Sequence, residues 1–299
     1  MRLRRRFVAL AAGAVAFAAP GVVGAGVHRH RRGRVFDPNP VVTLQDETLT
    51  DQKDADYAAL QDAYKLVTLT NLDGSGFLRG DHDADVCGTK SCAFSSDGTF
   101  LFGRDHTWFE QVMAYYAITQ SQLYIQGLGF TNVNDEPQVV RADQFGGDNS
   151  FYDPKKDTIT VGKGGVDDGE DAEVIWHELG HAIQDDQVPG FGVTHDANSI
   201  GEGFGDYWAF TMSVPVSGGF ELGCIADWDS VSYTVGDARR RSRTEGSCRP
   251  GQATSRLTAW AVAVSPATAR TAASHRRPGA RAVGTAAMTQ PNPTASSVR

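Results

Sequence analysis

The sequence predicts an α+β protein in which a strand-rich part precedes a helical part. Between residues 35 and 103, short apolar runs are separated by turn signals such as Asp73-Gly74-Ser75-Gly76 and Asp97-Gly98, a pattern typical of short strands. Further along the chain, apolar residues recur at helical spacing over Trp108–Leu128 and Ala172–Asp185. Strands followed by helices, rather than alternating with them, form an α+β arrangement.

Charge is distributed unevenly along the 299 residues. Residues 1–34 contain eight Arg and no acidic residue, residues 35–237 contain 35 acidic and nine basic residues, and residues 238–299 contain eleven Arg and one acidic residue. The acidic middle argues against a nucleic-acid surface, because binding phosphates requires clustered Lys and Arg. Together with the element pattern, it suggests four parts: residues 1–34, 35–103, 104–237 and 238–299.

Residues 1–34 have the pattern of a signal peptide followed by a basic linker. Arginines precede a mostly apolar run, Phe7–Ala25, in which small residues allow cleavage after Ala18 or Ala25. An uncleaved membrane anchor is the alternative, because this run approaches the length of about 20 residues that spans a bilayer. Either outcome places the acidic part outside the cytoplasm, as a secreted or a membrane-anchored protein.

The four cysteines fit such an oxidising compartment. Cys87 and Cys92 enclose four residues, which favours a local disulfide over a zinc knuckle with its two-residue spacing. Cys224 and Cys248 are the candidates for a second bridge, with Cys248 lying in the C-terminal segment.

Residues 238–299 differ from the rest of the chain in composition. They contain no Lys, Phe, Ile or Tyr, and their apolar periodicity is confined to Leu257–Val264. A basic arm for nucleic acids or membranes and a disordered extension both fit this composition. We interpret the segment as a disordered tail. Our hypothesis for its origin is that a GC-rich coding sequence is translated here in the wrong reading frame.

An acidic triplet raises the question of calcium. Asp81, Asp83 and Asp85 alternate as the first ligands of a calcium loop do, but Val86 stands where that loop needs a glycine for its sharp turn. A solvated acidic turn is the preferred interpretation, and Ca²⁺ is the less favoured of two candidate cofactors.

Within residues 104–237, apolar periodicity predicts helices and strands. Trp108–Leu128 predicts a helix that ends at its flanking glycines, and Gln138–Ala142 and Ser150–Val161 predict strands. The helix Ala172–Asp185 follows. Acidic residues crowd its start, where free N–H groups and the positive end of the helix dipole favour them: Asp167, Asp168, Glu170 and Asp171.

Two histidines leave this helix on the face opposite its apolar stripe. On a helical wheel with Ile175 at zero, His177 and His181 fall at about 200° and 240°. Because they are one turn apart, both imidazoles can reach one Zn²⁺ at about 2.0–2.1 Å. Glu178 projects beside them, where it can hold a water at the metal. The alternative is a surface helix with two solvated histidines.

A second motif begins twenty residues after His181. Gly201-Glu202-Gly203-Phe204-Gly205-Asp206-Tyr207-Trp208-Ala209 opens an aromatic-rich helix, which we expect to be buried. A buried Glu202 carboxylate is costly unless it is paired or binds a metal. Asp206, one turn on, can accept a hydrogen bond from a ligand histidine. A capping box from Ser199 to Glu202 is the alternative, but it leaves Asp206 unexplained.

The His-Glu-x-x-His motif at 177–181, followed at this spacing by Gly-Glu-Gly-x-x-Asp at 201–206, resembles the thermolysin-like and fungalysin-like zinc metallopeptidases, which are gluzincins. The resemblance implies a zincin-like fold with a strand-rich N-terminal lobe, an active-site helix and a helical C-terminal lobe. It also implies that His177, His181 and Glu202 are zinc ligands, that Glu178 is the general base, and that Asp206 orients a ligand histidine.

Asn149-Ser150-Phe151-Tyr152 resembles the edge strand along which this family holds its substrate, so Asn149, Ser150 and Tyr152 are candidate substrate-binding residues. Three features depart from the family. Gln184–Ile200 contains no tyrosine donor, and the only histidine after the second motif is His275, in the tail. His195 could substitute, although we interpret it as a solvated loop residue. The helical C-terminal lobe is incomplete.

The sequence therefore predicts a secreted, monomeric zinc metalloendopeptidase that acts on proteins or peptides and binds no nucleic acid. It predicts membrane association only if the signal is an uncleaved anchor. In the implied mechanism, Zn²⁺ and Glu178 activate a water that attacks a peptide carbonyl. The alternative is a catalytically impaired zinc-binding secreted protein, truncated or frameshifted, that lacks the C-terminal lobe.

Overall fold

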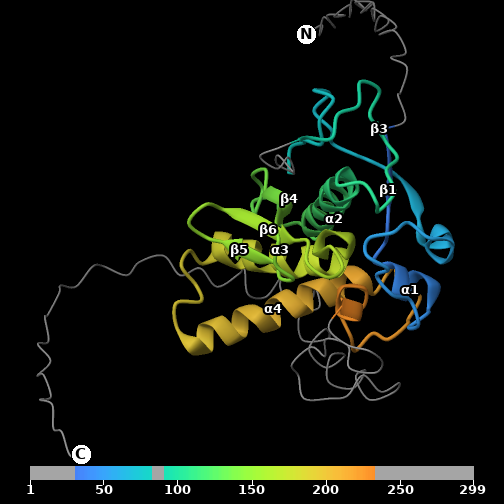
Figure 1. The fold of residues 1–299 in the computed structure, drawn as a ribbon. Helices are drawn as coiled ribbons and strands as arrows, with labels where there is room; N and C mark the ends of the chain where they lie inside the picture. The colour runs from blue at the N-terminus through green and yellow to red at the C-terminus, as the bar shows by residue number, and fades with distance from the viewer. Residues whose placement is uncertain (1–30, 83–90, 233–299) are drawn as a thin grey trace, which may run out of the picture.

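The computed structural model describes residues 31–82 and 91–232 (Figure 1). The predicted signal peptide, the predicted tail with His275, and Asp83, Asp85, Cys87 and Cys248 lie outside these ranges. Within them the chain is a mixed α+β protein with two small sheets and several helices, as the sequence predicts. No helix in the described part of the chain is long and apolar enough to cross a membrane.

The first sheet has the strand order β2-β1-β3. Strand β1 (Arg32–Val35) pairs antiparallel with β2 (Lys65–Thr68) and parallel with β3 (Thr99–Phe100). The short helix α1 (Pro40–Leu44) and the 3₁₀ helix η1 (Ala58–Ala63) connect β1 to β2.

The predicted boundary at residue 34 falls inside β1, so the last residues of the predicted linker belong to the folded part. Gly33 explains how β1 reaches the core. A Cβ at this position would lie 2.8 Å from Val112 Cγ1 and 2.9 Å from Leu69 Cδ2. The absence of a side chain therefore lets the strand lie directly on the helix that carries Val112.

Helix α2 (Trp108–Gly127) is the centre of the core and matches the predicted helix. Most of its side chains are buried, and two tryptophans from other helices donate hydrogen bonds to it. Trp176 Nε1 donates to the Ala117 carbonyl at 2.9 Å, and Trp208 Nε1 donates to Ser121 Oγ at 2.8 Å. These two bonds fix both site-bearing helices against α2.

The second sheet has the order β4-β6-β5, formed by β4 (Val139–Phe145), β6 (Thr158–Gly162) and β5 (Phe151–Asp153). Strands β4 and β6 are parallel, and β5 pairs antiparallel with β6 at the edge of the sheet. The predicted Ser150–Val161 is thus a hairpin, because the chain turns at 154–157, where Asp157 has a φ of 47°.

Helices α3 (Ala172–Gln187) and α4 (His195–Ser213) pack against each other (Figure 1). Asp171 caps α3 by accepting a hydrogen bond from Glu173 N at 3.0 Å, as expected for an acid at this end. Helix α4 starts earlier than predicted. Thr194 Oγ1 accepts from Ala197 N at 3.2 Å and caps it, so His195 is its first residue rather than a loop residue.

This earlier start excludes the capping box. Ser199 lies one turn inside α4, and its hydroxyl donates to the His195 carbonyl at 3.1 Å. A serine bonded in this way cannot cap the helix, because it accepts no N–H of the first turn.

One hydrophobic core spans the predicted boundary between residues 103 and 104. It contains residues of both parts, among them Val35, Phe100, Ile175 and Trp176. Beside it, the fully buried Arg104 donates from Nε to Glu170 Oε2 at 2.8 Å and from Nη2 to Asp51 Oδ1 at 2.7 Å. The two predicted parts therefore fold as one unit.

Two buried carboxylates lie at the start of α3. Glu173 accepts from Ser213 Oγ at 2.5 Å and from Ala226 N at 2.7 Å, while Asp171 accepts from Trp228 N at 3.0 Å. Asn39 Nδ2 is 3.3 Å from both acids. Burial raises the pKa of Asp171 to about 6, and burial together with the charge of Asp171 raises the pKa of Glu173 well above its usual range.

These shifts predict that the protein is more stable at pH 5 than at pH 8. The folded chain retains protons that the unfolded chain releases above about pH 4, so the free energy of unfolding falls as the pH rises through the folded-state pKa values. We expect to see this loss in urea titrations with a chelator present. Glu173→Gln should reduce the loss without abolishing it, because burial also raises the pKa values of Glu170 and Asp227. Greater wild-type stability at pH 8 would contradict the prediction.

Candidate metal centre

The face of α3 that turns toward α4 carries His177 and His181, and α4 carries Glu202 opposite them. The His177 and His181 rings are 5.0 Å apart between centroids. Glu202 Oε2 is 3.4 Å from His177 Nε2, and Glu202 Oε1 is 3.8 Å from His181 Nε2. One potential ligand atom from each of the three residues lies within 4.8 Å of the other two. The structure thus brings together the three ligands that the sequence predicts.

Glycines allow the two helices to approach this closely. A Cβ on Gly180 of α3 would lie 2.8 Å from Gly205 Cα of α4, closer than such atoms can come. A Cβ on Gly205 would lie 2.9 Å from the His177 ring and from the His177 carbonyl oxygen. Gly205 therefore forms the surface on which the His177 ring rests. No local pattern in the sequence marks Gly180 or Gly205 as part of the site.

Asp206 orients one of the histidines. Its Oδ1 lies 2.9 Å from His177 Nδ1, so this ring nitrogen can donate to the carboxylate while Nε2 faces Glu202 and His181. Burial lowers the pKa of His177, but hydrogen bonds with Asp206 and Glu202 outweigh it and raise the pKa to about 9. Burial, aided by the charge of His177, lowers the pKa of His181. The two rings thus differ in their affinity for protons.

Glu202 is not buried, contrary to the expectation from its aromatic-rich helix. Its side chain is 56% exposed. The aromatic residues of α4 pack on another face, where Trp208 is buried against α2, whereas the Glu202 face borders an open cleft. Glu202 therefore cannot be supported as a ligand by the cost of burying a charge. It is supported by its position opposite the two histidines.

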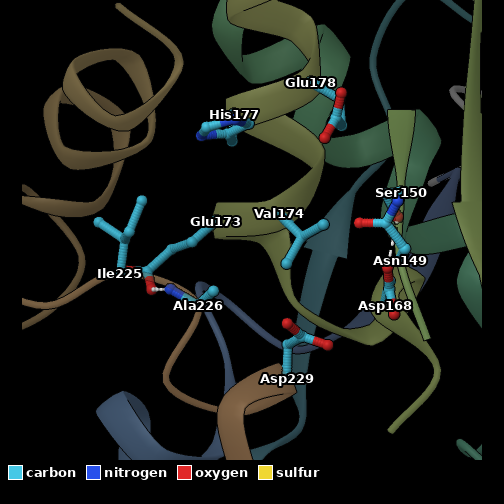
Figure 2. A pocket seen from close by; sticks show the side chains of 10 residues that line it. All are labelled: Asn149, Ser150, Asp168, Glu173, Val174, His177, Glu178, Ile225, Ala226 and Asp229. Atoms are coloured by element: carbon cyan, nitrogen blue, oxygen red, sulfur yellow. Dashed lines mark hydrogen bonds between the residues drawn. The ribbon is translucent and has the colours of Figure 1, made fainter. Parts of the chain in front are cut away.

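The cleft has a volume of about 1170 Å³ and contains the three potential ligands, Glu178 and Asp206 on its walls. Glu178 is 7% exposed and belongs to α3, one residue from His177. Figure 2 shows a second, smaller cavity that shares His177, Glu178 and Ser150 with the lining of the cleft; His177 and Glu178 lie on neighbouring sides of α3, and Ser150 lies on the strand side. The volume of this second cavity is about 10 Å³, enough for about one water.

The candidate substrate-binding residues line the same cleft. Asn149 and Ser150 precede β5, and Tyr152 lies within it. The Ser150 hydroxyl donates to Asp168 Oδ2 at 2.6 Å, so this side chain is committed to the protein interior. Strand β5 itself is at the edge of its sheet, and a peptide can pair only with such an edge.

Other acidic groups lack the imidazoles that favour zinc. Among the described residues, Asp148, Asp168 and Asp229 form one group of three potential ligands, and Glu221, Cys224 and Asp227 form another. The first group offers carboxylates alone, which suit harder cations, and the second includes Cys224, which is not a free thiol and so offers no thiolate. Neither Cys92 nor Cys224 is a free thiol, and the predicted partners Cys87 and Cys248 lie outside the described residues, so both pairings stay predictions.

No protein-family model matches the chain, and no curated protein matches it. The functional interpretation consequently depends on the residues of the site.

Proposed function

We propose that this protein is a zinc-dependent metalloendopeptidase with a zincin-like fold. The observation that carries the proposal is the convergence of His177, His181 and Glu202 at the wall of a cleft large enough for a peptide. Sites of several hundred Å³ that combine a few polar groups with a metal are typical of enzymes.

The donor set fits zinc. Ligands at about 2.0–2.1 Å from a tetrahedral ion are about 3.4 Å from one another, and Glu202 is 3.4 and 3.8 Å from the two histidine Nε2 atoms. Two imidazoles and one carboxylate leave a fourth position for water or substrate, as catalytic zinc sites require. When bound, zinc would supply Lewis-acid polarisation of a carbonyl and a more acidic water.

Residues of the chain would carry out proton transfer, orientation of a ligand histidine and peptide binding. Glu178 has a carboxylate on the cleft wall beside His177, where it can accept a proton from water and pass it to the leaving amine. Asp206 fixes the orientation of the His177 ring. The open backbone edge of β5 can hold an extended peptide as an added strand.

We also propose that the protein is secreted and acts as a monomer on proteins or peptides. The N-terminal pattern of residues 1–34 supports export. Residues 35–237 contain many more acidic than basic residues, which supports a peptide substrate rather than a nucleic acid.

Zinc analysis combined with a casein assay tests the proposal. We expect about one zinc per chain after purification, casein cleavage that o-phenanthroline stops, and recovery when zinc is restored. Bound zinc without any turnover would overturn the enzyme assignment in favour of a catalytically impaired zinc protein. Purified chain that binds no zinc would overturn the metal centre itself.

A further inference from the structure

We propose that the cleft selects peptides with a lysine or arginine side chain close to the cleaved bond, and that Asp185 of α3 is the residue that selects them. This inference rests on the proposed function, because it names the substrate class of the same cleft.

Acidic residues in the lining of the cleft greatly outnumber basic ones. Its described lining contains four carboxylates, Glu178, Asp185, Glu202 and Asp206, and no lysine or arginine. Three of these carboxylates surround the metal centre. Asp185 is the remaining one in that lining, and it is therefore the group whose charge faces a substrate.

The Asp185 carboxylate is held in place rather than free to rotate. Oδ1 accepts a hydrogen bond from Gly190 N at 2.9 Å, and Oδ2 is 3.3 Å from Tyr152 Oη. Burial, together with the carboxylates of Asp157 and Asp185, raises the pKa of Tyr152, so its hydroxyl keeps its one proton, which Asp185 Oδ2 shares with the nearer Asp157 Oδ1 at 3.1 Å. A half-buried carboxylate fixed in this way binds a cation more strongly than a mobile surface acid does.

The place of Asp185 on α3 and its contact with β5 both put it close to the path that a bound peptide would take. Along α3 it is four residues beyond His181, about 6 Å on the helix axis, which equals about two residues of extended chain. Through Tyr152 it also touches β5, the edge with which a peptide would pair. Phe191, which lines the same cleft, offers an apolar ring for the stem of a long cationic side chain.

The test uses fluorogenic peptides that differ at one position, occupied by lysine, norleucine or glutamate and moved stepwise around the cleaved bond. At one position we expect kcat/KM for lysine to exceed that for norleucine by about tenfold, with glutamate lower still. Asp185→Asn, which keeps an acceptor oxygen for Tyr152 or Gly190, should reduce the ratio to about twofold.

The neighbouring Asp186 provides the matched control. It accepts from Asn134 N at 2.8 Å and does not line the cleft, so Asp186→Asn should retain the tenfold ratio. Hydrolysis with equal rates for lysine and norleucine, or a ratio that Asp185→Asn leaves unchanged, would overturn the inference while the endopeptidase stands.

A binding measurement separates the two proposals. Labelled lysine and norleucine peptides are titrated with the Glu178→Gln protein and with the same protein carrying Asp185→Asn, and binding is followed by fluorescence anisotropy. If wild-type protein hydrolyses no peptide but lysine-selective binding depends on Asp185, the proposed activity is rejected and the selectivity is supported. Equal binding of the two peptides would overturn the selectivity.

Discussion

Glu178→Gln is expected to reduce peptide hydrolysis by about 10² to 10⁴-fold while the protein keeps its zinc. Glutamine has nearly the same shape but cannot accept a proton from water at neutral pH. Glu178 is 7% exposed on the cleft wall, beside His177 on the same helix, and it is not among the three potential ligands. The measurement is kcat/KM on casein or a fluorogenic peptide, together with the zinc content of the same preparation.

The zinc content makes this result interpretable. Loss of both activity and zinc would indicate that the substitution disturbs the site, and His177→Ala shows the size of that effect. Activity within about tenfold of wild type, with zinc retained, would show that Glu178 is not the base and that another cleft carboxylate must be considered.

Gly205→Ala is expected to damage the metal centre from the opposite helix. The new Cβ would lie 2.9 Å from the His177 ring and from the His177 carbonyl, so α3 and α4 must separate or the ring must turn. Overpacking of this kind costs about 1–3 kcal/mol of stability. Because the ring also leaves its hydrogen bond to Asp206, zinc affinity should fall by about 10- to 100-fold. A urea titration and a competitive zinc titration measure the two effects.

Gly203→Ala is the matched control, two residues away in the same helix. A Cβ at Gly203 meets nothing within 4 Å, so alanine should only relieve the cost of glycine in a helix and add about 0.5–1 kcal/mol. Its zinc affinity should equal that of wild type. If the two variants behaved alike, the close approach of the helices at Gly205 would not determine the site.

The sequence alone was sufficient where the information is local. Helical spacing predicted α2 and α3 within two residues of their observed ends, and the acids before residue 172 predicted the cap that Asp171 provides. The i, i+4 spacing of His177 and His181 fixed their common face, because one turn of helix separates them whatever surrounds it. Glu202 was grouped with these histidines as a predicted ligand because of the family motif, and not because of helical spacing.

Tertiary structure decided what depends on contacts between distant segments. The exposure of Glu202 and the start of α4 at His195 differ from the predictions, because the helix is capped by Thr194 and buries Trp208 on the side away from the cleft. The place of residues 32–34 in the first sheet depends on Gly33 meeting Leu69 and Val112, far along the chain.

The same holds for the distances in the site. No pattern in the sequence shows that Gly180 and Gly205 let α3 and α4 touch, yet this contact brings Glu202 within 4 Å of both histidines. The sequence by itself determined which donors this protein offers to a metal. The packing of one helix on another, governed by the size of side chains at their crossing, decided that the donors meet.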